Sequence, residues 1–427
     1  MYPFLLCERG GDVARARRWP ARLCARRALL SGSALVSAGL CLSLAVVPTP
    51  VLAVDISTQA QLDAAIAAGQ TTINIVAGNL ALSNAQTFAA GTDLTVASGA
   101  SLSTASNQAV GSLSGAGTLI LGTNGLAVGS NNTNTAFSGT INLTNQGYNP
   151  TYGTFAKTGT GTLTINNATI TQGESYITQG AMAQTGGNTA FTYLAVGTGT
   201  TGGNPNVGAL NVSGGTISFG TGLQVGDFSG QGTLNQTGGT VTVAATCGDP
   251  AHCAALHIGN QGGTGTYNIS GGELDLVGSN NELGRSTGNK PASAGTLNIS
   301  GTGVVDLSGN SAGGGALIIG YGNENVAPNT SQGVINQTGG TLRVHNGSTL
   351  YLTGANSSSS SVYNLNGGTL EIGGNSLKAG YGGTSNPYQF NLGGGTIKVI
   401  ESALVTSVNA TLTGGVSTID TNGLGAT

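Results

Sequence analysis

The stretch that decides the fold is Gly208-Ala-Leu-Asn-Val-Ser-Gly-Gly-Thr-Ile217. Variants of it return along the chain, and their first residues are Gly232, Gly265, Gly295, Gly333, Ser361 and Tyr388. The asparagine that they share occurs at Asn211, Asn235, Asn268, Asn298, Asn336, Asn364 and Asn391, at intervals of 24 to 38 residues. Such a repeat predicts a solenoid, because each unit can bury its apolar side only by stacking on its neighbours.

Each repeat has the pattern of three short strands. The first carries the Leu-Asn phrase, the second follows the Gly-Gly turn, as in 240–243, and the third ends in Gly, as in 256–259. We therefore expect an all-β fold, a right-handed parallel β-helix (solenoid) with coils about 4.8 Å apart.

Alternation within the strands sorts interior from exterior side chains. In the second strand Val241 and Val243 are expected to point inward. The residues at the position between them form an outward row of Ser218, Thr242, Asp275, Asp306, Arg343, Glu371 and Lys398. The third strand predicts another outward row of Gln224, His257, Glu282, Ile318, Tyr351 and Lys378. The interior positions are nearly all occupied by one type of residue, apolar, while the residue types at the exterior positions vary. This contrast is typical of a scaffold that displays a surface.

The segment before the repeats predicts a short helix. Thr58 and Gln61 fit a capping box, Leu62 and Ala65 follow at helical spacing, and Gly69 ends the helix. A helix here would cover the open edge of the first coil. We divide the chain into four parts, namely 1–53, a signal peptide; 54–100, the cap and first coils; 101–207, further coils; and 208–427, the repeats quoted above.

Composition excludes several classes of protein. Glycine makes up 75 of the 427 residues, more than twice the roughly 7% of ordinary proteins. No Gly-X-Y period is present, so collagen is excluded. Charged residues make up 7% and the net charge is −3, so the chain lacks the basic footprint of a nucleic-acid-binding protein. A G-x-G-x-x-G match at 197–202 lies in no βαβ pattern and predicts no nucleotide site.

Residues 1–53 have the features of a secretory signal peptide. Seven of the 13 basic residues precede the apolar run 28–47, and residues 51–53 fit a cleavage site. An uncleaved membrane anchor and a twin-arginine signal at Arg26-Arg27 are the alternatives. We expect a cleaved signal peptide and an exported protein.

Beyond this leader the only cysteines are Cys247 and Cys253. In an oxidising compartment a local disulfide between them is the default interpretation. Metal binding together with His252 or His257 is the alternative, although the spacing matches no standard zinc pattern. We expect no cofactor.

Three stretches of the chain resemble passenger-domain repeats of Gram-negative autotransporters. They are Gly-Ser-Leu-Ser-Gly-Ala-Gly-Thr-Leu at 111–119, the segment 128–139, and Lys-Thr-Gly-Thr-Gly-Thr-Leu-Thr-Ile at 157–165. The resemblance covers most of residues 54–427. It implies an exported β-helical passenger and a partner, an outer-membrane β-barrel translocator.

The chain departs from that family because it has no C-terminal series of roughly 10-residue lipid-facing strands with aromatic girdles. We therefore expect the translocator to be missing from this chain and Thr427 to be a truncation point. The expected location is the cell surface, the outer membrane or the extracellular space, or the periplasm if the product is truncated.

One pair of acidic residues has a spacing that suggests a catalytic or cation-binding site. Asp275 and Asp306 are adjacent in the outward row, and their expected gap of about 4.8 Å nearly matches the carboxylate pair of retaining glycosidases. A cation site is also conceivable. The simpler interpretation is a pair of solvated charges, since no third acid, Arg or His is clearly placed beside them. The seven repeat asparagines are interpreted as a structural ladder of side-chain hydrogen bonds.

These observations favour a non-enzymatic, exported rod for cell-surface display or adhesion, with no catalytic, cofactor or metal site. Its ligand would be a host or surface glycan or a protein. The alternatives are a polysaccharide-active β-helix enzyme and an exported repeat protein held by another sorting tail.

Overall fold

The computed structural model describes residues 53–143, 154–244, 256–278, 280–286, 291–308, 315–322, 331–354, 360–383 and 386–427. The chain divides into two units, Met1–Thr49 and Pro50–Thr427, and all described residues belong to the second. The predicted signal peptide, apart from its last residue, lies outside the described residues, as do Cys247, Cys253 and His252. No helix in the described ranges has the length and apolar character that a bilayer crossing requires.

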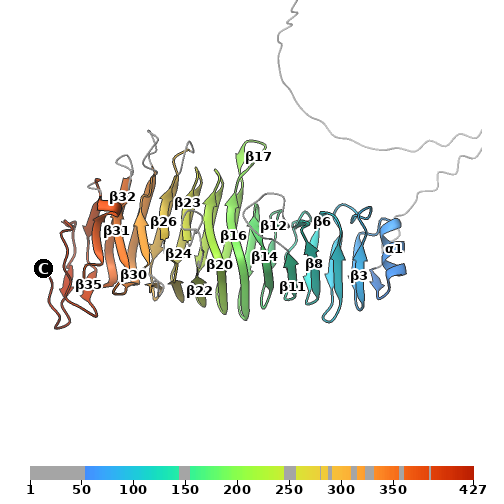
Figure 1. The fold of residues 1–427 in the computed structure, drawn as a ribbon, viewed down its shortest axis with the longest axis horizontal. Helices are drawn as coiled ribbons and strands as arrows, with labels where there is room; N and C mark the ends of the chain where they lie inside the picture. Colours follow the sequence, from blue (N-terminus) through green and yellow to red (C-terminus); the bar gives the residue numbers. More distant parts are fainter. Residues whose placement is uncertain are drawn as a thin grey trace, which may run out of the picture. The chain divides into compact units, whose positions relative to one another are not determined.

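The described residues form a parallel β-helix, which confirms the predicted fold class (Figure 1). Successive coils place strands on three walls, and nearly every strand pairs in parallel with strands one coil before and after it. We number the walls by their order within a repeat.

The first wall contains β1 (Val54–Ile56), β2 (Thr72–Ile75), β4 (Asp93–Val96), β7 (Ser112–Gly115), β10 (Thr135–Ala136), β13 (Thr162–Thr164), β15 (Gly180–Gln184), β19 (Val207–Val212), β21 (Gln231–Gln236), β24 (Thr264–Ile269), β27 (Ala294–Ile299), the first halves of β30 (Gln332–Val344) and β32 (Ser360–Ile372), β34 (Gln389–Leu392) and β36 (Thr411–Leu412). The second wall contains β3 (Asn79–Leu82), β5 (Ser101–Thr104), β8 (Thr118–Gly122), β11 (Thr140–Leu143), the first parts of β14 (Thr169–Ile177), β16 (Asn188–Thr198) and β20 (Thr216–Asp227), then β22 (Thr240–Val243), β25 (Glu273–Leu276), β28 (Val304–Leu307), the second halves of β30 and β32, β35 (Thr396–Val399) and β37 (Thr418–Asp420).

The third wall contains β6 (Gln108–Val110), β9 (Leu126–Val128), β12 (Thr154–Lys157), the last parts of β14, β16 and β20, β23 (Leu256–Asn260), β26 (Asn280–Arg285), β29 (Ala316–Ile319), β31 (Thr349–Thr353) and β33 (Leu377–Gly380). A short antiparallel hairpin, β17 (Thr200–Thr201) with β18 (Asn204–Pro205), projects from the coil between β16 and β19. A 3-10 turn at Tyr381–Gly383 follows β33.

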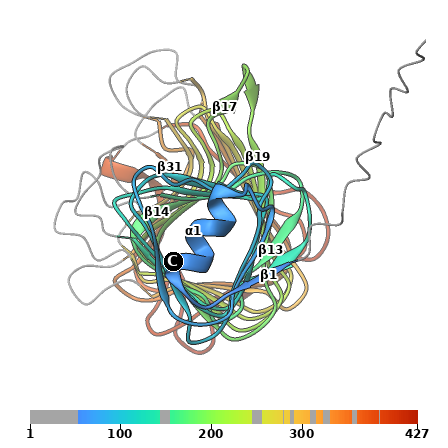
Figure 2. The same ribbon diagram turned by 90° about the vertical axis from the view of Figure 1, so that its right-hand side faces the viewer.

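The N-terminal end of the coil stack is closed by α1 (Gln59–Ala67), as predicted (Figure 2). Thr58 Oγ1 accepts from the amide of Gln61 at 3.4 Å, and Gln61 Oε1 accepts from the amide of Thr58 at 3.0 Å. Leu62 and Ala65 are buried in the same core cluster as the first strands. The helix therefore supplies the apolar surface that a preceding coil would otherwise have to provide.

The interior is one continuous apolar core that runs through all three walls. The predicted inward residues Val241 and Val243, like Ile217 and Phe219 one coil earlier, are fully buried. Phe191 stacks on Phe219 with ring centroids 5.7 Å apart, so neighbouring coils also contact through their side chains. Burial of such rows supplies the main stabilisation of the fold.

The turn between the first and second walls requires glycine. Gly239 has φ of +72°, and a Cβ atom at this residue would lie 2.6 Å from the carbonyl oxygen of Gly215 in the preceding coil. The Gly-Gly pair of the repeat therefore serves both the backbone conformation and the close stacking of successive turns.

Three interior glutamines support the same turn from inside. Gln236 Nε2 donates to the carbonyl oxygens of Gly239 at 3.1 Å and Glu273 at 2.8 Å. Tyr267, one coil later, donates its hydroxyl to Gln236 Oε1 at 2.6 Å. Gln337 and Tyr363 repeat this arrangement. In the coil after Gln184 the position of the tyrosine is occupied by Leu210, and Gln184 Oε1 therefore has no hydrogen-bond partner.

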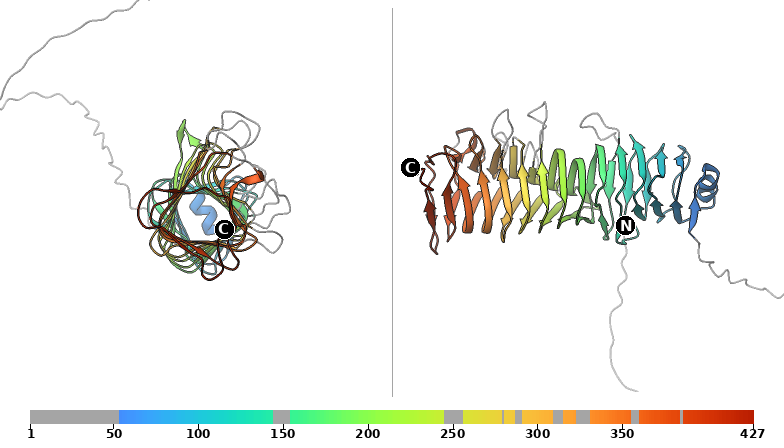
Figure 3. Two further views of the ribbon diagram at one scale, coloured as in Figure 1. Left: turned by 90° about the vertical axis from the view of Figure 1, so that its left-hand side faces the viewer. Right: turned by 90° about the horizontal axis from the view of Figure 1, so that it is seen from below.

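The two ends of the stack differ (Figure 3). The final coil continues the inward rows, because Leu412 pairs in register with Leu392 and Ile419 with Ile397. Leu412 is nevertheless 77% exposed and Ile419 is 61% exposed. These side chains would be interior residues if a further layer covered them.

Candidate functional site

The outward row of the second wall has the predicted order. Ser218, Thr242, Asp275, Asp306, Arg343, Glu371 and Lys398 pair in register from coil to coil. The register extends one step further, from Lys398 to Asp420. This row therefore presents one charge per coil from Asp275 onward.

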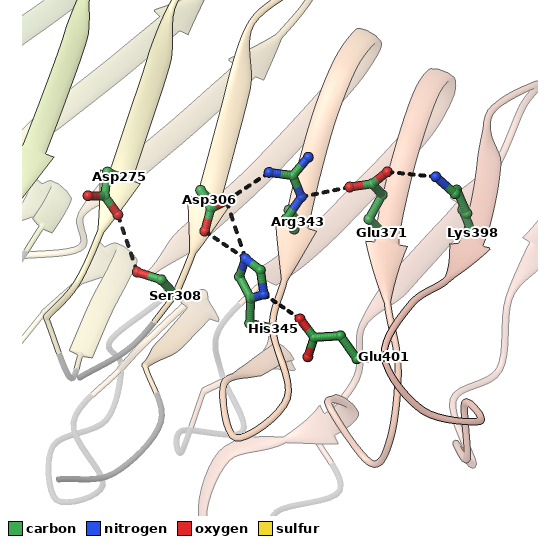
Figure 4. A network of polar contacts seen from close by, with 8 residues as sticks. All are labelled: Asp275, Asp306, Ser308, Arg343, His345, Glu371, Lys398 and Glu401. Atoms are coloured by element: carbon green, nitrogen blue, oxygen red, sulfur yellow. Dashed lines mark hydrogen bonds and ion pairs between the residues drawn. The ribbon is translucent and has the colours of Figure 1, made fainter. Parts of the chain in front are cut away.

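Ion pairs link these charges into a ladder (Figure 4). Arg343 lies between two carboxylates, with Nη1 3.0 Å from Asp306 Oδ2 and Nε 2.7 Å from Glu371 Oε2. Lys398 Nζ lies 3.2 Å from Glu371 Oε1. Partial burial alone would raise the pKa of Glu371, but the hydrogen bonds from Arg343 and Lys398 outweigh burial and lower it.

The predicted acidic pair is present in register, but its two members differ in their surroundings. Asp275 accepts from Ser308 Oγ at 3.2 Å, and its pKa is raised mainly by burial and further by the charge of Asp306. Asp306 contacts Arg343 and also lies 3.3 Å from His345 Nε2. The prediction that no Arg or His lies beside the pair is therefore wrong. Because Asp306 is already ion-paired, the two carboxylates do not form the open pair of a retaining glycosidase.

His345 joins the charge ladder to the start of the last coil. Its Nδ1 lies 2.5 Å from Glu401 Oε1, and Glu401 Oε2 accepts from the amide of Asn346 at 2.7 Å. Burial lowers the pKa of His345, but the contacts with Glu401 and Asp306 outweigh it and raise the pKa overall. Sequence reasoning missed this contact, because Glu401 lies two coils further along the chain than His345.

The outward row of the third wall also has the predicted register, but four of its members are not solvated. Gln224, His257, Glu282 and Ile318 are all buried, which corrects the expectation of an exposed row. Tyr351 and Lys378 remain partly exposed, and Lys378 Nζ lies 6.0 Å from the Tyr351 ring. Alternation identifies the side of the sheet that a residue faces, but it does not reveal what covers that side.

Several polar side chains are buried close together in this part of the third wall. His257 Nε2 lies 3.2 Å from Glu282 Oε2, and Arg285 Nε lies 2.7 Å from the same oxygen without the alignment of a hydrogen bond. Burial lowers the pKa of His257 despite Glu282. Burial likewise raises the pKa of Asp227 to about 7, although Asn260 Nδ2 donates to it at 2.9 Å. Burial therefore favours the neutral forms of His257 and Asp227 in this cluster.

The seven repeat asparagines form a continuous ladder on the first wall. Each Nδ2 donates to the Oδ1 of the asparagine one coil earlier, at distances from 2.7 to 3.0 Å, from Asn235 and Asn211 through to Asn391 and Asn364. The ladder ties coils together on the outside, as the inward rows do on the inside.

Other features favour no chemical site. Among the described residues, no group of three or more His, Cys, Asp or Glu side chains could hold a metal ion. The predicted disulfide of Cys247 and Cys253 and a metal site with His252 lie outside those residues. The glycine-rich match at 197–202 runs from β16 into the hairpin, and no α-helix follows it in the described chain.

Comparison with known proteins adds no identification: no family model, no curated protein and no solved structure matches the chain.

Proposed function

We propose that the protein is an exported β-helical rod for display or adhesion at the cell surface, of the autotransporter-passenger kind. The observation that carries the proposal is the contrast between the walls' two sides. Inward rows are mostly apolar and buried over many coils, while the outward row of the second wall changes its chemistry from coil to coil. Such a scaffold can vary its surface without disturbing its core.

The sequence supports the same proposal. The stretch 111–119, which resembles passenger repeats, lies on β7 and β8 and takes part in ordinary coil pairing. Residues 1–53 have the features of a secretory signal. The proposed partner is an outer-membrane β-barrel translocator.

We propose no catalytic role. On the second wall, Asp306, Arg343, Glu371 and Lys398 are engaged with one another, and the cluster around Glu282 is buried. A polysaccharide-active enzyme would need acids that can reach a substrate.

Expression of the full chain in Gram-negative cells tests the proposal. Mass spectrometry should find a mature N-terminus at Val54, and fractionation should place the product outside the inner membrane. A variant without residues 1–53 is the control and should stay in the cytoplasm. Supplied with a translocator, the exported product should become sensitive to protease on intact cells. Retention of the full chain in the cytoplasm with Met1 intact would refute the proposal.

A further inference from the structure

The outward side of the first wall carries no charged side chain over the nine coils from β13 to β34. Its first row, in register, is Thr162, Ala181, Ala209, Thr233, Thr266, Thr296, Val334, Val362 and Gln389. Its second row is Thr164, Ala183 and the seven asparagines of the ladder. We call these two rows the neutral face. The other two walls carry the charged residues described above.

The asparagine ladder leaves regular hydrogen-bonding capacity on this face. A side-chain amide has two N–H groups and an oxygen with two lone pairs. Within the ladder, an inner asparagine such as Asn268 uses one N–H and one lone pair on its neighbours. One N–H and one lone pair per coil remain, at an interval of about 4.8 Å. All seven asparagines are partly exposed, so solvent or a ligand can reach them.

A cavity adjoins the neutral face at the base of the hairpin. It measures about 470 Å³ and is lined by Thr158, Thr178, Gln179 and residues 204–207, none of them charged. Its last lining residue, Val207, is the first residue of β19 and thus belongs to the same wall. The cavity is a surface hollow, widely open to solvent, and is continuous with that wall.

The lining offers polar groups that protein contacts leave available. The side-chain amides of Gln179 and Asn204 are exposed and have no hydrogen-bond partner among the described residues. Lys157, which directly precedes the lining residue Thr158, is 1% exposed and donates to the carbonyl oxygens of Thr158 at 2.5 Å and Gly159 at 2.9 Å. Its charge is directed into the protein, so the cavity matches uncharged ligands.

We propose that the neutral face and its adjoining cavity bind an extended, neutral polysaccharide. This inference rests on the proposed display function and names its ligand class. A charged polymer would find no counter-charge in these two rows, and a protein partner would favour aromatic anchors, which the two rows lack. The hydroxyl groups of a neutral polysaccharide both donate and accept hydrogen bonds, so an extended chain laid along the coils can pair with the free N–H groups and lone pairs of the ladder.

Titration of the full chain with cellohexaose, followed by calorimetry, tests the proposal. Thr296→Glu places a charge in the middle of the neutral face, and the pair Gln179→Ala and Asn204→Ala removes the free amides of the cavity. Thr169→Glu puts the same charge on the second wall and is the matched control. We expect the first two variants to bind at least about tenfold more weakly and the control to bind within about twofold of the parent. Circular dichroism melts check that each variant is folded.

Three results would overturn the inference: no binding of cellohexaose, equal binding of the anionic hexagalacturonate, or equal weakening by Thr169→Glu. Self-association of the chain that Thr296→Glu abolishes would assign the face to a second copy instead. The display function is judged separately, by protease access on intact cells. A chain that is displayed but binds no neutral glycan would refute the proposed ligand and leave the display function standing. A chain that binds the glycan but is not displayed would refute the display function and leave the proposed ligand standing.

Discussion

The hydrogen bond between Tyr267 and Gln236 offers a sharp test of how the interior is stabilised. Both side chains are buried, and burial raises the pKa of the Tyr267 hydroxyl well above its ordinary value, so it remains a donor at any ordinary pH. Tyr267→Phe removes only the oxygen atom. Gln236 Oε1 is then buried without a partner, because Nε2 of the same amide stays on the turn carbonyls. We expect a loss of about 1–3 kcal/mol in the free energy of unfolding.

Urea unfolding followed by circular dichroism measures this loss, with hydrogen exchange to locate it, because solenoids need not unfold in one step. Tyr363→Phe should cost a similar amount, since Tyr363 donates to Gln337 at the same distance of 2.6 Å. Tyr351→Phe, on an outward and partly exposed residue, is the control and should change stability by less than about 0.5 kcal/mol. If Tyr267→Phe is as mild as this control, the hydrogen bond contributes nothing and the reasoning fails.

Three further predictions concern the walls. Val243→Asp should destabilise the chain by several kcal/mol, because it buries an unpaired charge. Thr242→Asp, one residue earlier but outward, should cost less than about 1 kcal/mol in the same urea assay. Similar costs for the two variants would contradict the orientation of the strand. His345, whose folded pKa is raised, should stabilise the fold fully below its unfolded pKa of about 6.5, and this contribution should disappear as the pH rises through the higher folded value. His345→Gln should flatten the pH dependence of the melting temperature in that window, and an unchanged profile would show that its contact with Glu401 is not linked to folding. Asn298→Ala removes two hydrogen bonds of the ladder and should lower the free energy of unfolding by about 1–3 kcal/mol. Hydrogen exchange should become faster in β27 and in its two neighbours, β24 and β30. Faster exchange confined to a distant coil would be inconsistent with the ladder.

The repeat phrase predicts much of this architecture. The recurrence of one asparagine at coil intervals is enough to predict both the register and the ladder, because identical residues in register can exchange identical hydrogen bonds. Period-two alternation also places Val241 and Val243 in the core correctly. These features are local or strictly periodic, and a single sequence contains them.

Features that depend on neighbouring coils or on covering segments were missed. Burial of His257 and Glu282 depends on what lies over the third wall, and strand alternation carries no information about it. The contact of His345 with Glu401 spans two coils, and Glu401 reaches it from a residue with φ of +59°. The inward Gln236 breaks the apolar pattern because its amide bonds to backbone carbonyls that a pattern of side chains does not show.

The asparagine ladder has a consequence for how such a molecule can change over generations. Because each rung from Asn211 to Asn391 makes the same contact with the rung beside it, any two rungs can become neighbours without a change in the ladder. Loss or duplication of DNA between two copies of the repeat would then shorten or lengthen the molecule by whole turns and leave the asparagine ladder continuous. Length is thus a property that recombination can adjust while the fold is preserved.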